Sequence, residues 1–566
     1  MNTKPNLRER ALYLFSPRRG NDAYNKRLRQ EKEQEQKTAG RGRSASSLRG
    51  LPSLRSGSPR MSYGSHGAST TKNSMLGWIV DAGNAEDSID LYSSTLRQRS
   101  RDLYESGGLA RSGVNTLTTS VCGWGIMPKP KIDGDFLGLS DEAREETERN
   151  ILREWRLWAE NKMCDAERQQ NFYDLQQLAF LSMLMSGDVF VLFGMKPNAR
   201  TPYQTTIRLI EADRICNPDS SGNSESAETD SGGRIIDGVE IDQEGVVIRY
   251  YIASRSPIAA NDNSELTWTP IDAFGSDTGY ENMLHIMTHE RPEQRRGVPL
   301  VAAEIEGLKQ FSRYMNAEIA GKLVSAMLTV FITSKDDDGK AGMEDAVNED
   351  EKVTDDELKL ELAPGAIYDL PPGKHPETVD PKRSDTQFEV FVNTFIMVIA
   401  SSMGIPKEVL VKKYESNYTA ARAALLDFWR TVKVYRRKFN SGFNQPIYEQ
   451  WLSEAVAAGR IDAPGFFDDP IVRQAWCGCS WMGASMGHVD PLKEVNAAEA
   501  RIRNNISTED QEAMEYNGND WSEIVRQREK EIATRAKMGG DAQEATESDS
   551  PPPDDGDDEK EDKEDE

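Results

Sequence analysis

The sequence predicts an α+β fold, and three features of its pattern support that class. Long stretches with helical apolar spacing and no proline predict helices over 301–333 and 384–403, and a further one over 418–458 is interrupted near its middle. Four short runs rich in β-branched and aromatic residues lie together between 188 and 253. The two ends of the chain are polar and lack sustained periodicity, so ordered structure is expected only over about 87–538.

The charge of the 566-residue chain is strongly acidic and unevenly distributed. It has 69 Lys+Arg against 94 Asp+Glu, a net charge of −25. Residues 1–60 carry +10 and residues 541–566 carry −12, which leaves −23 on the body over 61–540. A protein that binds duplex DNA tightly is normally basic, because phosphate neutralisation supplies most of the affinity. The body is therefore not expected to hold DNA tightly.

Composition also bears on the compartment. The most apolar stretch, Phe388 to Met403, has 16 residues, whereas a spanning helix needs roughly 20. The N-terminus shows no apolar segment followed by a small-residue cleavage site. Five cysteines, an odd and scattered number, argue against a disulfide scaffold: Cys122, Cys164, Cys216, Cys477 and Cys479. These observations predict a soluble, intracellular protein.

In the first half, helices are expected over Asp87–Gly107, Asp141–Lys162 and Asn171–Ser186. The second of these places Trp155 and Trp158 near its inner face, and Gly187 ends the third at a C′ position. The β-rich runs that follow are 188–195, 205–212, 234–242 and 245–253. Their separation by turn residues predicts an antiparallel sheet or a small barrel.

In the second half, Pro299 is expected in the first turn of the long helix that continues to Thr333. The next segment, 335–383, begins with 12 acids and 4 lysines over 335–361 and then becomes proline-rich. Ser384 opens the following helix with a capping-box pattern, and a break follows Met403.

The C-terminal part of the body is expected to be mainly helical. The helix over 418–458 is expected to bend or break near Gly442 and Pro446. Helix returns over 491–538, where Asp520 provides a capping signal.

The search for catalytic and metal motifs finds no nucleophile elbow, zinc-protease motif or Walker A pattern. His285 and His289 lie in a segment that favours a strand, which would set them too far apart to share one ion, so packing or surface histidines are expected. Cys477 and Cys479 are closer together than zinc-knuckle spacing, which favours buried thiols. No enzyme, metal or cofactor is predicted.

Seven segments, taken in order, are together informative although each is weak alone. They are RSRDLYESGGLARSGVNTL (99–117), VCGWGIMPKP (121–130), DLQQLAFLSMLMSGDVF (174–190), IRLIEADRICNP (207–218), HERPEQRRGVPL (289–300), LAPGAIYDLPPG (362–373) and SNYTAARAALL (416–426). In these segments and their order, which extend over about 90–535, the sequence resembles the portal proteins of tailed bacteriophages, lambda type. It departs from them in its basic N-terminal arm, its acidic insertion near 336–361 and its acidic tail.

The resemblance implies a portal fold: a mixed α/β wing, a long-helix stem, a small clip and a helical crown, assembled as a homo-oligomeric ring of about a dozen subunits. Such a ring would lie at one capsid vertex of the virion after assembly in the host cytoplasm. It would nucleate procapsid assembly, pass double-stranded DNA without sequence specificity during packaging and ejection, and hold the tail. The implied partners are the major capsid and scaffold proteins, the terminase large subunit and the head-completion and tail connector proteins.

The same resemblance divides the chain into regions. They are a basic, largely disordered arm (1–86), the first part of the wing (87–296), a stem helix (297–334), the clip with its acidic insertion (335–383), a second stem helix (384–403), the tunnel loop (404–417), a long wing helix (418–458), the second part of the wing (459–490), the crown (491–538) and an acidic disordered tail (539–566).

Two sets of site residues follow from this division. Lys407, Lys412 and Lys413 lie in the tunnel loop, where we expect them to touch passing DNA transiently; the alternative is that they are solvated loop lysines. The clip is expected to present a rigid surface to terminase and connector, or else to be a plain inter-helix loop. Its residues are Leu362, Pro364, Tyr368, Pro371, Pro372 and Lys374.

Some questions remain open from the sequence. The arm over 1–60 could bind scaffold, capsid or DNA, or could be a processed leader. A DNA-processing enzyme of the packaging machinery and a tail or baseplate adaptor without DNA contact are the competing functions. The first would need a nucleophile with its base or clustered carboxylates with a metal.

Overall fold

The computed structural model describes residue 74 and residues 83–218, 227–228, 233–257, 264–276, 278–327, 385–413, 418–487 and 491–537. The chain divides into Met1–Ala82 and Gly83–Glu566, and all elements considered below belong to the second unit. None of the described helices combines the length and apolar character needed to cross a bilayer.

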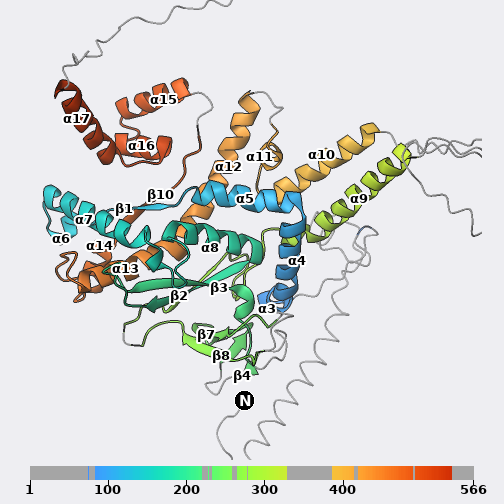
Figure 1. Cartoon of the computed structure of the whole chain (residues 1–566), viewed down its shortest axis with the longest axis horizontal. Coiled ribbons are helices and arrows are strands. Elements are labelled where there is room, and N and C mark those ends of the chain that lie inside the picture. Colours follow the sequence, from blue (N-terminus) through green and yellow to red (C-terminus); the bar gives the residue numbers. More distant parts are fainter. Residues whose placement is uncertain are drawn as a thin grey trace, which may run out of the picture. The chain divides into compact units, whose positions relative to one another are not determined.

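The first half contains six described helices, of which the largely apolar α8 packs against α4 and α5 (Figure 1). They are α3 (Ala85–Ser88), α4 (Ser93–Ser106), α5 (Gly108–Cys122), α6 (Gly134–Leu137), α7 (Asp141–Ala159) and α8 (Phe172–Ser186). The predicted helix over 87–107 is thus α4 preceded by α3 and a 3₁₀ turn. Helix α5 was not predicted, because its many Gly, Ser, Asn and Thr residues weaken the apolar pattern.

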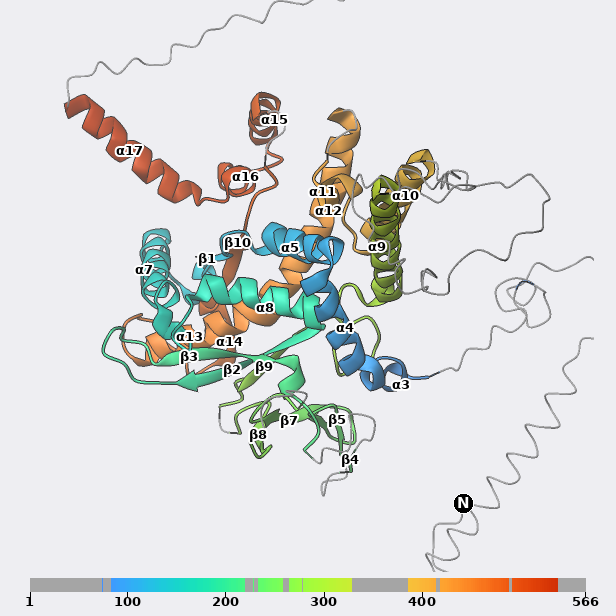
Figure 2. The ribbon, with the colours of Figure 1, turned by 45° about the vertical axis from the view of Figure 1, so that its right-hand side comes forward.

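Within the described residues, the strands form two antiparallel sheets and a separate pair. β2 (Asp188–Met195) lies between β3 (Thr205–Glu211) and β9 (Met283–Met287), and α8 lies across this sheet (Figures 1 and 2). The second sheet has the order β4-β5-β6-β7-β8. Its strands are β4 (Ala227–Glu228), β5 (Arg234–Ile236), β6 (Val239–Ile241), β7 (Val247–Ala253) and β8 (Trp268–Asp272). The pair joins β1 (Met127–Pro130) to β10 (Cys479–Met482).

The strand predictions are right in kind, with two corrections. The prediction of a single sheet or small barrel is wrong, since the strands divide between two sheets. The run 234–242 is a hairpin and not one strand. Asp237 and Gly238 take φ values of 43° and 82°, and two successive positive φ values are what a tight hairpin turn requires.

The main core lies between α7, α8 and the long C-terminal helices, and aromatic rings fill much of it. Trp155 and Trp158 are buried as predicted, with their ring centroids 5.0 Å apart. Trp155 also packs edge-on against Phe172 and Trp451, each at 5.0 Å. Such aromatic contacts add stability beyond the area that they bury.

The second half begins with two long helices, α9 (Ile305–Met327) and α10 (Asp385–Ser402), followed by the short α11 (Lys407–Val411). The prediction that Pro299 lies in the first turn of α9 is wrong, because α9 begins at Ile305, after a 3₁₀ turn over Ala302–Glu304. Ser384, predicted as the cap of α10, and residues 328–333 lie outside the described part of the chain.

The predicted interruption of the 418–458 helix is confirmed. α12 (Tyr418–Phe439) passes through a π-helical turn at Asn440–Asn444 into α13 (Gln445–Ala457). Then come α14 (Pro470–Trp476), α15 (Pro491–Arg503), α16 (Glu509–Asn517) and α17 (Trp521–Lys537). The capping signal of α17 is also confirmed, because Asp520 Oδ1 accepts a hydrogen bond of 2.9 Å from the Ser522 amide.

Candidate functional site

The three lysines predicted to face a channel lie on and just after α11, and α11 is fixed to α5. Leu410 is buried, and its carbonyl oxygen accepts a 2.7 Å hydrogen bond from Ser112 Oγ. Lys412 ends α11 in the left-handed conformation, with φ at 57°. Lys407 is half-buried, whereas Lys412 and Lys413 are exposed. Lys412 and Lys413 are therefore exposed at consecutive positions, next to a residue that is hydrogen-bonded to α5.

The second predicted set falls outside the described residues. It comprises Leu362, Pro364, Tyr368, Pro371, Pro372 and Lys374, all within 328–384. Their expected role stays a prediction.

Helices α9 and α10 form an antiparallel hairpin whose inner face is aromatic. Phe311 stacks on Phe395 at 4.9 Å, and Tyr314 contacts Phe391 at 4.9 Å and Phe388 at 5.9 Å. Positions later in α9 thus meet positions earlier in α10. Figures 1 and 2 show the two helices side by side, and the rings pack between them.

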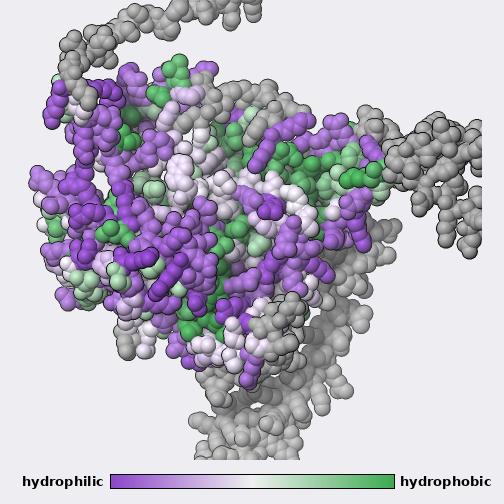
Figure 3. Space-filling model, viewed as in Figure 1, coloured by the Kyte–Doolittle hydropathy of each residue, from purple (hydrophilic) through white to green (hydrophobic). Residues whose placement is uncertain are grey.

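The outer faces of this hairpin are also apolar, but they are exposed. On α10, Val390, Met397 and Val398 are 65%, 51% and 55% exposed, at i, i+7 and i+8 spacing along one side of the helix. On α9, Ile319 and Leu323, at i and i+4, are each 54% exposed. Figure 3 shows hydrophobic residues gathered over these two helices. We call these the α10 stripe and the α9 stripe.

The two stripes point to opposite sides of the hairpin. At 3.6 residues per turn, the α9 stripe lies roughly a third of a turn round its axis from the aromatic inner face. The α10 stripe lies a similar rotation away in the opposite sense. Because the helices are antiparallel, rotations of opposite sense place the stripes on opposite sides. One hairpin therefore offers two different apolar surfaces to other molecules at once.

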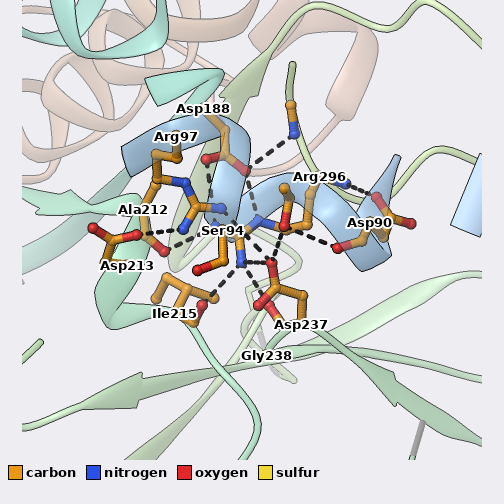
Figure 4. A network of polar contacts seen from close by, with 12 residues as sticks. Asp90, Ser94, Arg97, Asp188, Ala212, Asp213, Ile215, Asp237, Gly238 and Arg296 are labelled. Carbon is orange, nitrogen blue, oxygen red and sulfur yellow. Dashed lines mark hydrogen bonds and ion pairs between the residues drawn. The ribbon is translucent and has the colours of Figure 1, made fainter. Parts of the chain in front are cut away.

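A second group of polar side chains, the arginine–aspartate cluster, is buried between the two sheets (Figure 4). Arg296 is fully buried, its Nε donating to Asp188 Oδ2 at 2.6 Å and its Nη1 lying 2.8 Å from Asp237 Oδ2. Arg97 on α4 donates from Nη1 to Asp213 Oδ1 at 2.7 Å. The cluster thus joins α4, β2, the turn after β3, the β5–β6 turn and the loop before α9.

The charges in this cluster determine the protonation of its members. Burial by itself would raise the pKa of Asp188, but Arg296 and the hydrogen bond from His285 hold that pKa well below its usual range. Burial raises the pKa of Asp90 to about 6, even though its Oδ1 accepts the Arg296 amide at 3.0 Å. Arg296, Asp188 and Asp237 have no exposed surface, so these groups join elements and do not bind a partner.

Sequence reasoning did not find this cluster. A signal was nevertheless present, because three of the segments that carried the family resemblance each supply a member. Asp188 lies in 174–190, Asp213 in 207–218 and Arg296 in 289–300.

The histidine and cysteine predictions can be compared directly with the structure. His285 lies on β9 as predicted, stacked on Phe190 with a centroid distance of 4.1 Å. Cys477 is buried and Cys479 half-buried, and burial raises the pKa of the Cys477 thiol to about 12. In the part of the chain that the structure describes, no group of three His, Cys, Asp or Glu side chains is placed to hold a metal ion.

Comparisons with known proteins give consistent matches. A family model described as phage portal protein, lambda family, matches residues 71–436. Portal protein B of Escherichia phage lambda is 23% identical over 460 residues, covering 78% of this chain and 84% of that protein. The portal protein of Escherichia phage N15 is 24% identical over 488 residues, covering 82% and 89%.

Solved structures match more distantly. A chain from the neck of an empty GTA particle, computed with C6 symmetry, is 13% identical with a TM-score of 0.41, covering 73% of this chain and 92% of that one. A chain from the neck of a native GTA particle, computed with C12 symmetry, is 12% identical with a TM-score of 0.37, covering 75% and 92%.

Proposed function

The chain belongs to the lambda family of phage portal proteins, a non-enzymatic family of virion components, and we propose that its copies close into the ring-shaped DNA channel at one capsid vertex. In this proposal about a dozen subunits form the ring. It nucleates procapsid assembly, docks terminase during packaging, conducts DNA on ejection, and holds the connector and tail. Its partners would be the capsid and scaffold proteins, the terminase large subunit and the head-completion proteins.

The observation that carries the ring is the pair of stripes on the α9–α10 hairpin. A surface that binds a different surface on the next copy gives a head-to-tail contact, and such contacts close into rings when the rotation permits. The α9 and α10 stripes are two such surfaces on one subunit. The proposed occupant of each is therefore the other stripe of a neighbouring copy, with α9 and α10 as the stem.

Electrostatics supports passage of DNA and argues against tight binding. The body over 61–540 carries a net charge of −23. Each cation that neutralises a phosphate releases counterions and deepens a binding well, so a duplex slides most easily past a wall with few such contacts. In the proposal Lys412 and Lys413, together with Lys407, supply brief contacts at the tunnel loop.

The remaining regions are assigned from the order of regions in the portal family. We place the wing at 87–296 and 459–490, the clip at 335–383 and the crown at 491–538. The clip would present its proline-rich tract to terminase and connector.

The ring is tested by placing charge on each stripe separately. We expect both I319D/L323D and V390D/M397D to abolish rings, because a buried unpaired carboxylate is costly at a contact. Val246→Asp, at a position 53% exposed just before β7, serves as the control and is expected to leave assembly intact. Sedimentation and negative-stain images measure the assembly, and circular dichroism confirms folding.

Mixing the two variants tests the head-to-tail geometry. The V390D/M397D chain keeps its α9 stripe and the I319D/L323D chain keeps its α10 stripe, so one productive contact remains possible. The mixture is therefore expected to give dimers and no rings, while each variant alone stays monomeric. Rings from either variant, or an equal loss with Val246→Asp, would contradict the assignment.

A further inference from the structure

The three C-terminal helices α15, α16 and α17 contain no buried residue. Large apolar side chains on α15, on α17 and in the loop between α15 and α16 are exposed: Leu492 is 73% exposed, Ile532 53% and Ile506 72%. Burial of apolar side chains is the usual source of attachment between parts of a protein. Something other than an apolar interface must therefore attach this segment, 491–537, to the rest of the chain.

Ion pairs connect the segment to the body on several elements. Lys129 on β1 pairs with both Asp510 and Asp520, the latter at 3.3 Å. Arg156 on α7 lies 2.9 Å from Glu523. In these pairs the body supplies the cation and the segment supplies the carboxylates.

Helix α12 provides two further contacts of the same polarity. Arg422 lies 3.6 Å from Glu494, and Lys433 lies 3.1 Å from Glu515. The segment thus meets cations from β1, α7 and α12 with acids from all three of its helices. This shared polarity makes the contact an electrostatic match between two surfaces.

The seam between segment and body is incompletely packed. A cavity of about 150 Å³ lies there, lined by Met127, Leu152 and Met482 on one side and by Asn519 and Asp520 on the other. Inside the segment, an ion pair of the same kind, two-pronged between Arg501 and Glu512, ties α15 to α16. The cavity marks the seam as a loosely packed boundary.

We propose that segment 491–537 is held by an ionic latch and undocks from the body as a unit when these charges are screened. Arg156–Glu523 and Lys433–Glu515 are exposed on both sides, and exposed ion pairs are individually weak and screened by salt; the pairs of Lys129 and Arg422 are partly buried. The segment has no fully buried side chain, and apolar side chains such as Met514, Ile524 and Val525 are only half-buried, so little apolar burial is available to replace the ion pairs. The latch is a property of the single chain, so a failure of the proposed ring would not contradict it.

The test measures energy transfer between dyes on the full chain as salt is raised. Dyes are placed at L157C on α7 and I532C on α17, at positions 47% and 53% exposed. Transfer is expected to fall between about 0.1 M and about 1 M salt, as the Debye length shortens from about 10 Å to about 3 Å. A pair at L157C and V434C, both within the body, is the control and is expected to stay constant.

Charge reversal separates an ionic latch from a general salt effect. R156E/K433E breaks two pairs, and its transition is expected at a salt concentration lowered by about twofold or more. Adding E523R and E515K restores both pairs with reversed polarity and is expected to restore the original transition. Transfer that stays high at about 1 M salt, or a transition that charge reversal does not move, would overturn the proposal.

Discussion

Arg296 is a charged residue whose whole side chain is withdrawn from water. Its guanidinium meets two carboxylates and also donates to the carbonyl oxygens of Ile215 and Ala212, at 2.9 Å and 2.8 Å. A buried charge is tolerable only when it is paired and hydrogen-bonded, and removing one partner typically costs about 3–5 kcal/mol. The arginine–aspartate cluster therefore fixes how the two sheets and α4 meet.

Asp90, beside Arg296, should make stability depend on pH. Its folded pKa of about 6 lies above the ordinary value of 3.8, so the folded state binds more protons between these values. Stability from this group is then present below about pH 4 and is lost as the pH rises through about 6. We expect D90N, which keeps the Oδ1 acceptor, to remove this loss and raise the thermal midpoint at pH 8.

This prediction is tested by measuring the thermal midpoint of the wild type and of D90N at a series of pH values from 4 to 8. The exposed Asp141→Asn is the matched control and should leave the profile unchanged. An identical pH slope in wild type and D90N would contradict the assignment of that slope to Asp90.

Gly297 is a position where only glycine fits. A Cβ there would lie 1.9 Å from the carbonyl oxygen of Gly187, and that backbone has no room to move without shifting the start of β2. We expect Gly297→Ala to destabilise the protein by about 2 kcal/mol or more, measured as a fall in denaturant midpoint. Gly108→Ala is the control: like Gly297 it has no positive φ, but a Cβ there meets no atom within 4 Å, so a cost equal to that at Gly297 would show that the close approach is unimportant.

At the scale of elements, the π-helical turn between α12 and α13 has a definite role. Its Asn444 is fully buried, and its Oδ1 accepts a 2.8 Å hydrogen bond from Gln176 Nε2 on α8. The same Gln176 bonds both the amide and the carbonyl of Ile126, at 2.8 Å and 3.0 Å. The turn thus orients Gln176, which in turn holds Ile126, the residue just before β1, in place.

Asn444→Ala should therefore lower the free energy of unfolding by more than the truncation of an exposed polar side chain does. It leaves one N–H of Gln176 buried without a partner, a loss of about 1–3 kcal/mol. Chemical denaturation measures the change, with the exposed Gln527→Ala on α17 as control. A difference of less than about 0.5 kcal/mol between the two variants would show that the buried amide finds another partner.

At the scale of the whole molecule, the tunnel-loop lysines can be tested in assembled particles. We expect K407E/K412E/K413E to form rings but to reduce the yield of filled particles by about tenfold, because it replaces the cations nearest the proposed duplex path with anions. Lys196, Lys530 and Lys537, reversed together, provide the control with the same change in charge. Unchanged packaging and genome retention in the triple variant would refute the role of these lysines.

Much of the element pattern could be predicted because it depends on residues close in sequence. β2 begins and ends where the predicted β-rich run 188–195 does, and the break near Gly442 is visible in the sequence as a glycine and a proline in a long helical pattern. The split of 234–242 into a hairpin could also have been predicted, since Asp-Gly is a strong turn signal. α5 could not, because small polar residues obscure its periodicity.

The sequence by itself determined the acidic body, the kinds of most elements and, through the order of seven segments, membership of a family. Only the tertiary structure decided which distant parts meet: β1 with β10, Arg296 with Asp188 and Asp237, and the aromatic inner faces of α9 and α10. Periodicity records which side of an element is apolar. Whether that side is covered depends on partners far along the chain, so the exposed stripes and the ionic seam became visible only once those partners were in place.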